Sequence, residues 1–184
     1  QLRQSGRIVR KTLETAQFTE GLGDLHALMD GDVHAIDADT AWIMSSGSGA
    51  KSRIYRTTNG GTSWTLQFMN PDTAAFYDCI SFGSGRGRTG VAFSDASGGR
   101  TNILHTDNDG ASWKLLAQTA VPAPLPGEGA FAASGLCVVH GDARTVFIAT
   151  ANDSEVRTSS SSPTASAAFS LLAIHLAVVL LAPI

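Results

Sequence analysis

A nine-residue pattern occurs twice in this chain, and it constrains the fold more than any other feature of the sequence. The stretch RTTNGGTSW begins at residue 56, and HTDNDGASW begins 49 residues later at residue 105. Five positions carry the same residue in both copies: Thr57 and Thr106, Asn59 and Asn108, Gly61 and Gly110, Ser63 and Ser112, and Trp64 and Trp113. The two copies therefore predict the same local structure at two places in the chain.

The shared residues suit a tight turn between two β-strands. A threonine hydroxyl and an asparagine carboxamide can hydrogen-bond the backbone of their own turn. Glycine tolerates a positive φ at which a side chain would clash. The tryptophan can bury a large ring beneath the turn. We therefore expect each copy to be a turn that is closed by side chains and anchored by its tryptophan.

The sequence on both sides of the turns repeats as well. SRIYRT before the first turn corresponds to TNILHT before the second, and SWTLQF after the first corresponds to SWKLLA. Further upstream, DVHAIDA and TAWIMSS correspond to YDCISFG and RTGVAFS. Each unit is thus predicted to hold four short strands, with the turn between the third and the fourth. Such units are typical of propeller blades, which must stack because one blade cannot bury both faces alone.

This repeat divides the chain into five predicted segments. Residues 24–68 form a first blade, residues 72–118 a second, and residues 130–158 a partial third, with ASGLCVV, RTVFIAT and SEVRT as its strands. Residues 1–23, which include GRIVRKT, are the frayed end of a preceding blade. Residues 159–184 are a Ser-rich linker and an apolar tail.

The apolar tail, residues 169–184, has three interpretations. The first is a short membrane segment or a lipid-anchor signal, which would associate the chain with a membrane. The second is a segment foreign to the fold, which arises from a shifted reading frame or a truncated gene. The third is a divergent strand of the third blade. A blade array left open exposes sheet faces and edges, so we expect a chain of this length to self-associate when it is expressed alone.

The composition supports an all-β fold and narrows the function. Charged residues make up 16% of the chain and there are 19 glycines, while helix-length periodicity is almost absent. The net charge of −3 argues against a nucleic-acid binder, which usually carries a basic stripe.

The chain contains two cysteines, Cys79 and Cys137, and their spacing is that of neither a metal site nor a redox motif. The simpler interpretation is two small buried thiols, and the alternative is one bridge in an oxidising compartment.

The paired turns resemble those of the Asp-box, or BNR-repeat, β-propellers. The stretches SRIYRTTNGGTSWTLQFMNPD, FYDCISF, GVAFSD and LPGEGAFAASG look like the members that are similar to photosystem II stability/assembly factors. The resemblance covers roughly residues 24–157, and it implies a propeller of which this chain supplies about three blades. It implies a non-catalytic binding scaffold with a protein partner. The alternative is a sialidase-like glycoside hydrolase or an inactive relative. We favour an extracytoplasmic (periplasmic or secreted) location.

A sialidase needs several arginines around the substrate carboxylate, a nucleophile and a carboxylic acid/base. The candidate residues are Arg53, Arg56, Arg86, Arg88, Arg100, Asp78 and Glu128. Nothing in the sequence holds the two carboxylates at the separation of about 5–9 Å that paired glycosidase carboxylates require. We therefore predict no catalytic residue.

Candidate binding residues lie in two loops. GSGRGR, residues 83–88, contains Arg86 and Arg88, and it is not expected to cradle a phosphate because no helix follows it. PAPLPGEGAF, residues 122–131, lengthens the connection to the third blade and carries Glu128. Extra length in such a connection often contacts a partner.

Two further features complete the candidate sites. Asn152 begins an N-x-S sequon, which is a candidate glycosylation site in a secretory eukaryotic setting. The histidines show no metal-ligand spacing, so we expect neither a metal site nor a cofactor. They are His26, His34, His105, His140 and His175.

Overall fold

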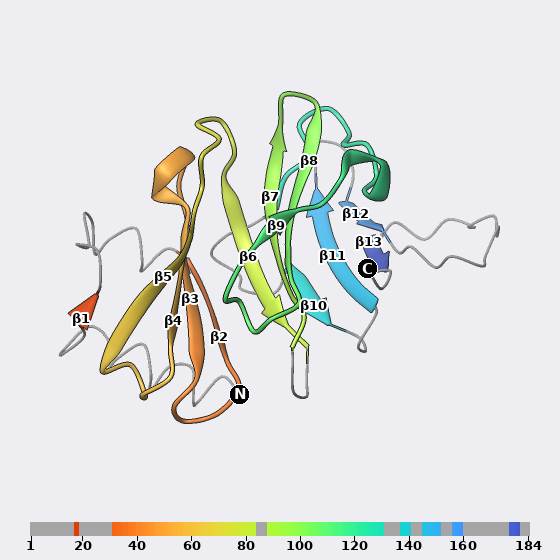
Figure 1. Ribbon diagram of the computed structural model, residues 1–184. Helices are drawn as coiled ribbons and strands as arrows, with labels where there is room; N and C mark the ends of the chain where they lie inside the picture. The colour runs from red at the N-terminus through yellow and green to blue at the C-terminus, as the bar shows by residue number, and fades with distance from the viewer. Residues whose placement is uncertain are drawn as a thin grey trace.

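The computed structural model is all-β, as the sequence predicts, and its strands form three sheets that stand side by side in Figure 1. The structure describes the following residues: 17–18, 31–83, 88–130, 137–140, 145–151, 156–159 and 177–180. The expected strand GRIVRKT lies outside the described residues.

The first sheet, orange to gold in Figure 1, contains four antiparallel strands in sequence order. They are β2 (Asp32–Ala35), β3 (Ala41–Ser45), β4 (Arg53–Thr57) and β5 (Ser63–Met69), with the short 3-10 helix η1 (Gly49–Lys51) between β3 and β4. A two-residue strand, β1 (Gln17–Phe18), pairs in parallel with β5 and completes the order β1-β5-β4-β3-β2.

The second sheet repeats the same order of strands. It consists of β6 (Tyr77–Phe82), β7 (Gly90–Ser97), β8 (Arg100–Thr106) and β9 (Lys114–Leu115), followed by the 3-10 helix η2 (Gln118–Ala120). Each of the eight strands β2–β9 overlaps a stretch that the repeat predicts, and β5, β7 and β8 extend one to three residues beyond theirs. The last strand differs in length, because β9 has two residues where β5 has seven.

The third sheet contains β10 (Val138–His140), β11 (Thr145–Ala151), β12 (Val156–Ser159) and β13 (Ala177–Leu180). Both β12 and β13 pair antiparallel with β11, at different parts of its length. Strand β13 comes from the apolar tail, which the predicted division placed outside the blades. Its pairing with β11 favours the interpretation of the tail as a divergent strand.

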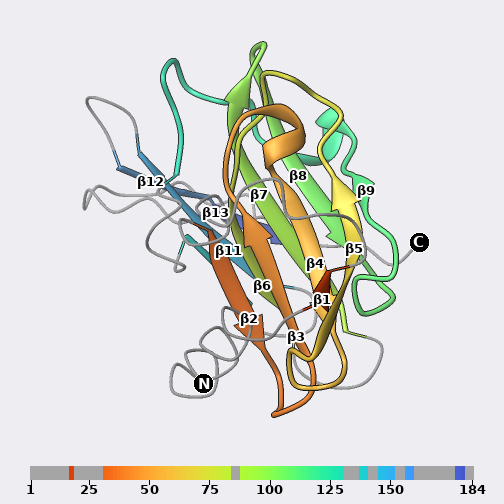
Figure 2. The ribbon, with the colours of Figure 1, turned by 90° about the vertical axis from the view of Figure 1, so that its left-hand side faces the viewer.

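The sheets pack face to face through alternate side chains of each strand, and Figure 2 shows the first sheet in front of the second. On β3, Trp42 and Met44 point into the core between the first and second sheets, and Ile43 points to the opposite face. The equivalent residues of the second sheet, 49 positions later, behave in the same way: Val91 and Phe93 point to the third sheet, and Ala92 points to the first. The repeat in sequence is therefore also a repeat in packing.

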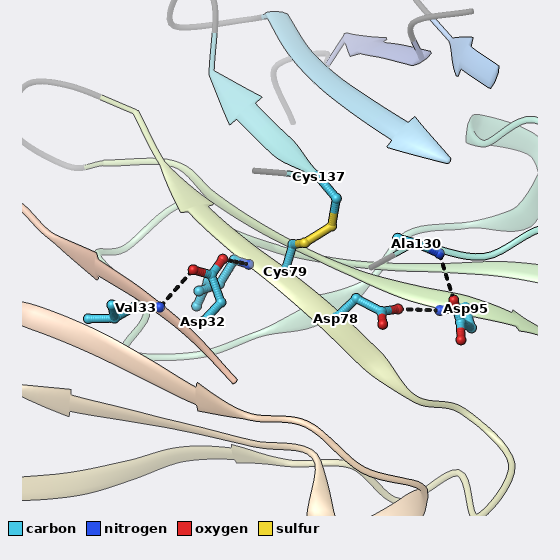
Figure 3. The surroundings of a disulfide bond; sticks show 8 residues. Asp32, Val33, Asp78, Cys79, Asp95, Ala130 and Cys137 are labelled. Carbon is cyan, nitrogen blue, oxygen red and sulfur yellow. Dashed lines mark hydrogen bonds between the residues drawn. A yellow bond between two sulfur atoms is a disulfide. The ribbon is translucent and has the colours of Figure 1, made fainter. Parts of the chain in front are cut away.

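The strands β2, β6 and β10 are neighbours across the three sheets. Two equivalent residues join them (Figure 3). Asp32, which pairs with Met44, accepts hydrogen bonds from the backbone N–H of Val33 at 2.7 Å and of Ile80 at 2.8 Å. Cys79, which pairs with Phe93 49 residues after Met44, forms a disulfide bond with Cys137. Asp32 and Cys79 are equivalent because each pairs with the same position of the next strand in its sheet. This pairing position therefore links each sheet to the next one.

The disulfide corrects the simpler interpretation of the two cysteines as separate buried thiols. Cys79 lies in β6 and Cys137 directly precedes β10, and their Cα atoms are 5.9 Å apart. Both residues are buried in the core between the second and third sheets. Sheet stacking therefore brings together two residues that lie 58 positions apart.

We predict that the double variant Cys79→Ala/Cys137→Ala has a free energy of unfolding about 4 kcal/mol lower than that of the oxidised protein. The reason is that a bridge over 58 residues restricts the unfolded chain. Urea denaturation with and without reductant measures this difference. Reductant should lower the midpoint of the wild type and leave that of the double variant unchanged. Equal midpoints for oxidised and reduced wild type, with thiol titration showing that reduction was complete, would contradict the prediction.

Candidate functional site

The first repeated turn is closed by hydrogen bonds among its own side chains. The Thr57 hydroxyl donates to Asn59 Oδ1 at 2.9 Å and accepts from the backbone N–H of Asn59 at 3.3 Å and of Gly61 at 3.0 Å. The Asn59 carboxamide accepts from the Ser63 N–H at 3.0 Å and donates to Ser63 Oγ at 2.9 Å. These five bonds tie the end of β4 to the start of β5.

The second turn makes the same five bonds. Thr106 and Asn108 take the places of Thr57 and Asn59, and the distances are 2.9, 3.4, 3.0, 3.0 and 2.9 Å. Gly110 has a φ of 74°, and Asp109 before it has a φ of 56°. Aspartate is among the few residues other than glycine that enter this left-handed region readily, so it can stand where the first turn has Gly60.

The second turn also packs on the first sheet through Trp42. A Cβ atom at Gly110 would lie 2.5 Å from Trp42 Nε1, so glycine is required there for packing as well as for φ. The Trp42 ring stacks on Phe82 with 3.8 Å between centroids, and Phe82 meets Trp113 edge-on at 5.6 Å. Trp42 is not among the residues that the sequence singles out, because its role depends on which faces of the sheets meet.

The two turn tryptophans differ in burial. Trp64 is fully buried on the face of the first sheet that points away from the second, beside Ile43 and Tyr55. Trp113 is half-buried and packs at the margin of the core between the first and second sheets. The short β9 follows Trp113 directly, and both of its residues are exposed.

The candidate binding residues contact other parts of the protein. Arg88 pairs with Asp109, with 3.5 Å between Nη1 and Oδ1, and its backbone N–H donates to the same carboxylate at 3.0 Å. Glu128 accepts from the Leu125 N–H and from the Thr150 hydroxyl, each at 2.6 Å, which ties the 122–131 loop to β11. Arg86 and the sequon residue Asn152 lie outside the described residues.

The candidate carboxylate Asp78 is buried on β6, near Asp95 of β7 (Figure 3). Asp78 Oδ2 accepts the Asp95 N–H at 3.1 Å, and Asp95 Oδ1 in turn accepts the Ala130 N–H at 2.8 Å. Burial, together with the negative charge of Asp95, raises the pKa of Asp78 well above its usual range. Asp78 is therefore a neutral, structural carboxyl group over much of the acidic pH range.

The candidate arginines do not converge on one site in the described part of the chain. Arg53 donates to the Ala50 carbonyl at 2.7 Å, Arg88 pairs with Asp109, and Arg100 is exposed at the start of β8. Arg56 lines a cavity of about 230 Å³ at the first turn. Its other lining residues are Thr58, Ser63, Thr65 and Gln67.

Three of the histidines are described, and burial lowers the pKa of each. The pKa of His34 and of His140 falls to about 4, and that of His105 also lies below its usual value. His140 Nδ1 lies 3.2 Å from Ser81 Oγ, which joins β10 to β6. No group of three or more metal-ligating side chains occurs within the described ranges, and His26 and His175 lie outside them.

A scan against protein-family models and a search of the curated proteins both find no match to this chain. In the portion of the chain that the structure describes, no helix is both long and apolar enough to span a membrane.

We predict that Trp64→Ala lowers the free energy of unfolding by about 3–5 kcal/mol, the usual cost of removing a buried aromatic ring. Trp113→Ala should cost clearly less, because part of that ring is already exposed. Denaturant titrations of the two variants, compared with Leu115→Ala at an exposed strand position, measure both costs. A larger loss for Trp113→Ala than for Trp64→Ala would contradict the assigned burial.

We predict that Asp78→Asn stabilises the protein increasingly as the pH rises from 5 to 8. A raised carboxyl pKa means that the folded state retains a proton that the unfolded chain releases near pH 4, so the wild type loses stability as the pH rises. Asparagine still accepts the Asp95 N–H and does not ionise. Urea midpoints at several pH values measure the effect, with the exposed Asp39→Asn as control. If the urea midpoints of Asp78→Asn and the wild type differed by the same amount at every pH in this range, the prediction would be contradicted.

Proposed function

We propose that this chain is part of an Asp-box β-propeller and acts as a non-catalytic scaffold that binds a protein partner. The observation that carries the proposal is the repeat of one closed turn, with the same five hydrogen bonds, at the same place in two stacked sets of four antiparallel strands, β2–β5 and β6–β9. Blades of a propeller require this combination of an internal repeat with face-to-face packing. In this proposal the first and second sheets are complete blades and the third is a divergent one.

The contacts of the candidate catalytic side chains with the rest of the protein favour a scaffold over a glycosidase. Asp78 is buried against Asp95, and Glu128 is held by hydrogen bonds from Leu125 and Thr150. Retaining and inverting glycosidases need two carboxyl groups that flank a substrate. Arg53 and Arg88 are likewise engaged by the protein itself. These contacts support a structural role for the residues that a sialidase-like enzyme would have used.

The disulfide supports an extracytoplasmic location for the scaffold. Cys79 and Cys137 join two neighbouring sheets inside the core, and structural disulfides persist mainly in oxidising compartments. The 122–131 loop has exposed prolines next to the rigidly held Glu128, and stiff loops of this kind often contact partners. We assign the partner surface to this loop.

Two assays on the full chain test the proposal. Incubation with a fluorogenic sialoside and with other aryl glycosides should give no turnover. A partner cross-linked from an oxidising-compartment extract, once purified, should bind saturably, and Pro126→Arg at the exposed loop should weaken that binding. The control is Arg100→Gln, which changes an exposed side chain on β8. Turnover that is lost in both Asp78→Asn and Glu128→Gln, with both variants folded, would overturn the scaffold in favour of a hydrolase.

A further inference from the structure

The cavity at the first turn is built from three consecutive pieces of the chain. Arg56 comes from β4, Thr58 from the turn, and Ser63, Thr65 and Gln67 from β5. The β5 residues alternate along the strand, which places them on one face of it. The volume of about 230 Å³ lies somewhat below that of pockets for drug-sized ligands, so the cavity suits a small molecule.

Arg56 is an unneutralised cation in this cavity. Its guanidinium carbon lies 5.4 Å from the centre of the Trp42 ring, and its Nε is buried without a hydrogen-bond partner. Within the described ranges its side chain forms no ion pair, in contrast to Arg88, which pairs with Asp109. A guanidinium that is fixed on an aromatic ring and lacks a counter-charge is suited to bind a carboxylate through paired hydrogen bonds.

The other lining groups indicate what the rest of the ligand carries. Thr58, Ser63 and Thr65 have hydroxyls and Gln67 has an amide, all of which can both donate and accept hydrogen bonds. The described lining contains no carboxylate that would repel an anion, and no aromatic side chain that would stack on a flat ring. Hydroxyl groups on the ligand match such a lining.

The second repeat offers an internal comparison for this cavity. The residues 49 positions later are His105, Asp107, Ser112, Lys114 and Leu116. An acid replaces Thr58 and a lysine replaces Thr65, and both act electrostatically on His105. The second repeat therefore supplies its own opposite charges, whereas the first leaves the positive charge of Arg56 without one. The shared turn does not require this arginine, so its presence calls for another explanation.

We propose that the cavity binds a small hydroxylated carboxylic acid. The Arg56 guanidinium holds the carboxylate, and the hydroxyls of Thr58, Ser63 and Thr65 bond the hydroxyl groups of the ligand. This site is separate from the partner surface assigned to the 122–131 loop, so either assignment can fail without the other.

Isothermal titration of the full chain with sodium glucuronate tests the site, with glucose, acetate and sulfate as comparison probes. Glucuronate should bind at least about tenfold more tightly than glucose, which lacks the charge, and than acetate, which lacks the hydroxyls. Binding should also change the tryptophan fluorescence, because Arg56 lies over Trp42. Equal affinity for sulfate or acetate, or no binding of glucuronate, would overturn the proposal.

Two variants locate the binding. Arg56→Gln removes the cation, and Thr58→Asp introduces at an exposed position the acid that the second repeat already carries. Each should weaken glucuronate binding at least about tenfold. Arg100→Gln, which makes the same change of net charge outside the cavity, should bind as the wild type does. If Arg56→Gln fails to fold, Thr58→Asp still decides, and unchanged binding by folded Thr58→Asp would refute the site.

Discussion

The stacking of one sheet on the next is the constraint on which the rest of the structure depends, and Trp42 is at its centre. Its ring is fully buried between the first and second sheets, stacked on Phe82 at 3.8 Å. Gly110 fits against its edge only because it lacks a Cβ. The turn that closes the second sheet is thus also part of the contact with the first. The closed turn and the packing between the sheets therefore stabilise each other.

The sheets are also linked at one equivalent position of β2 and β6, by a hydrogen bond in the first case and by a disulfide in the second. Asp32 reaches from β2 to the backbone of Ile80 on β6, and its equivalent Cys79 reaches from β6 to Cys137 beside β10. Burial raises the pKa of Asp32 to about 6, against the lowering effect of the two N–H donors. The first link is therefore sensitive to pH and the second to reduction. Each junction between sheets has its own chemical dependence although the backbone geometry repeats.

The sequence predicts the turns and strands well, because their signals are local. Glycine, threonine and asparagine close a turn within nine residues, and alternate apolar residues mark the strands on either side. The disulfide, the Arg88–Asp109 pair and the role of Trp42 depend on which faces meet after the sheets stack, which no local pattern contains. The sequence left the strand β13 as one of three interpretations of the apolar tail for the same reason, since only its pairing with β11 distinguishes it from the other two.

The repeat also separates positions that build the fold from positions that are free to differ. The shared Thr, Asn, Gly and Ser of each turn make the same hydrogen bonds, and the shared tryptophan packs on a sheet, while the positions between them differ. At one of these positions and at the two that flank the shared residues, the copies diverge in charge: Thr58 corresponds to Asp107, Arg56 to His105, and Thr65 to Lys114. Closure of the turn requires none of these identities, because the second turn makes the same five hydrogen bonds with the other set. Differences between the repeats, rather than their common residues, are therefore where a specific function of each sheet is to be sought.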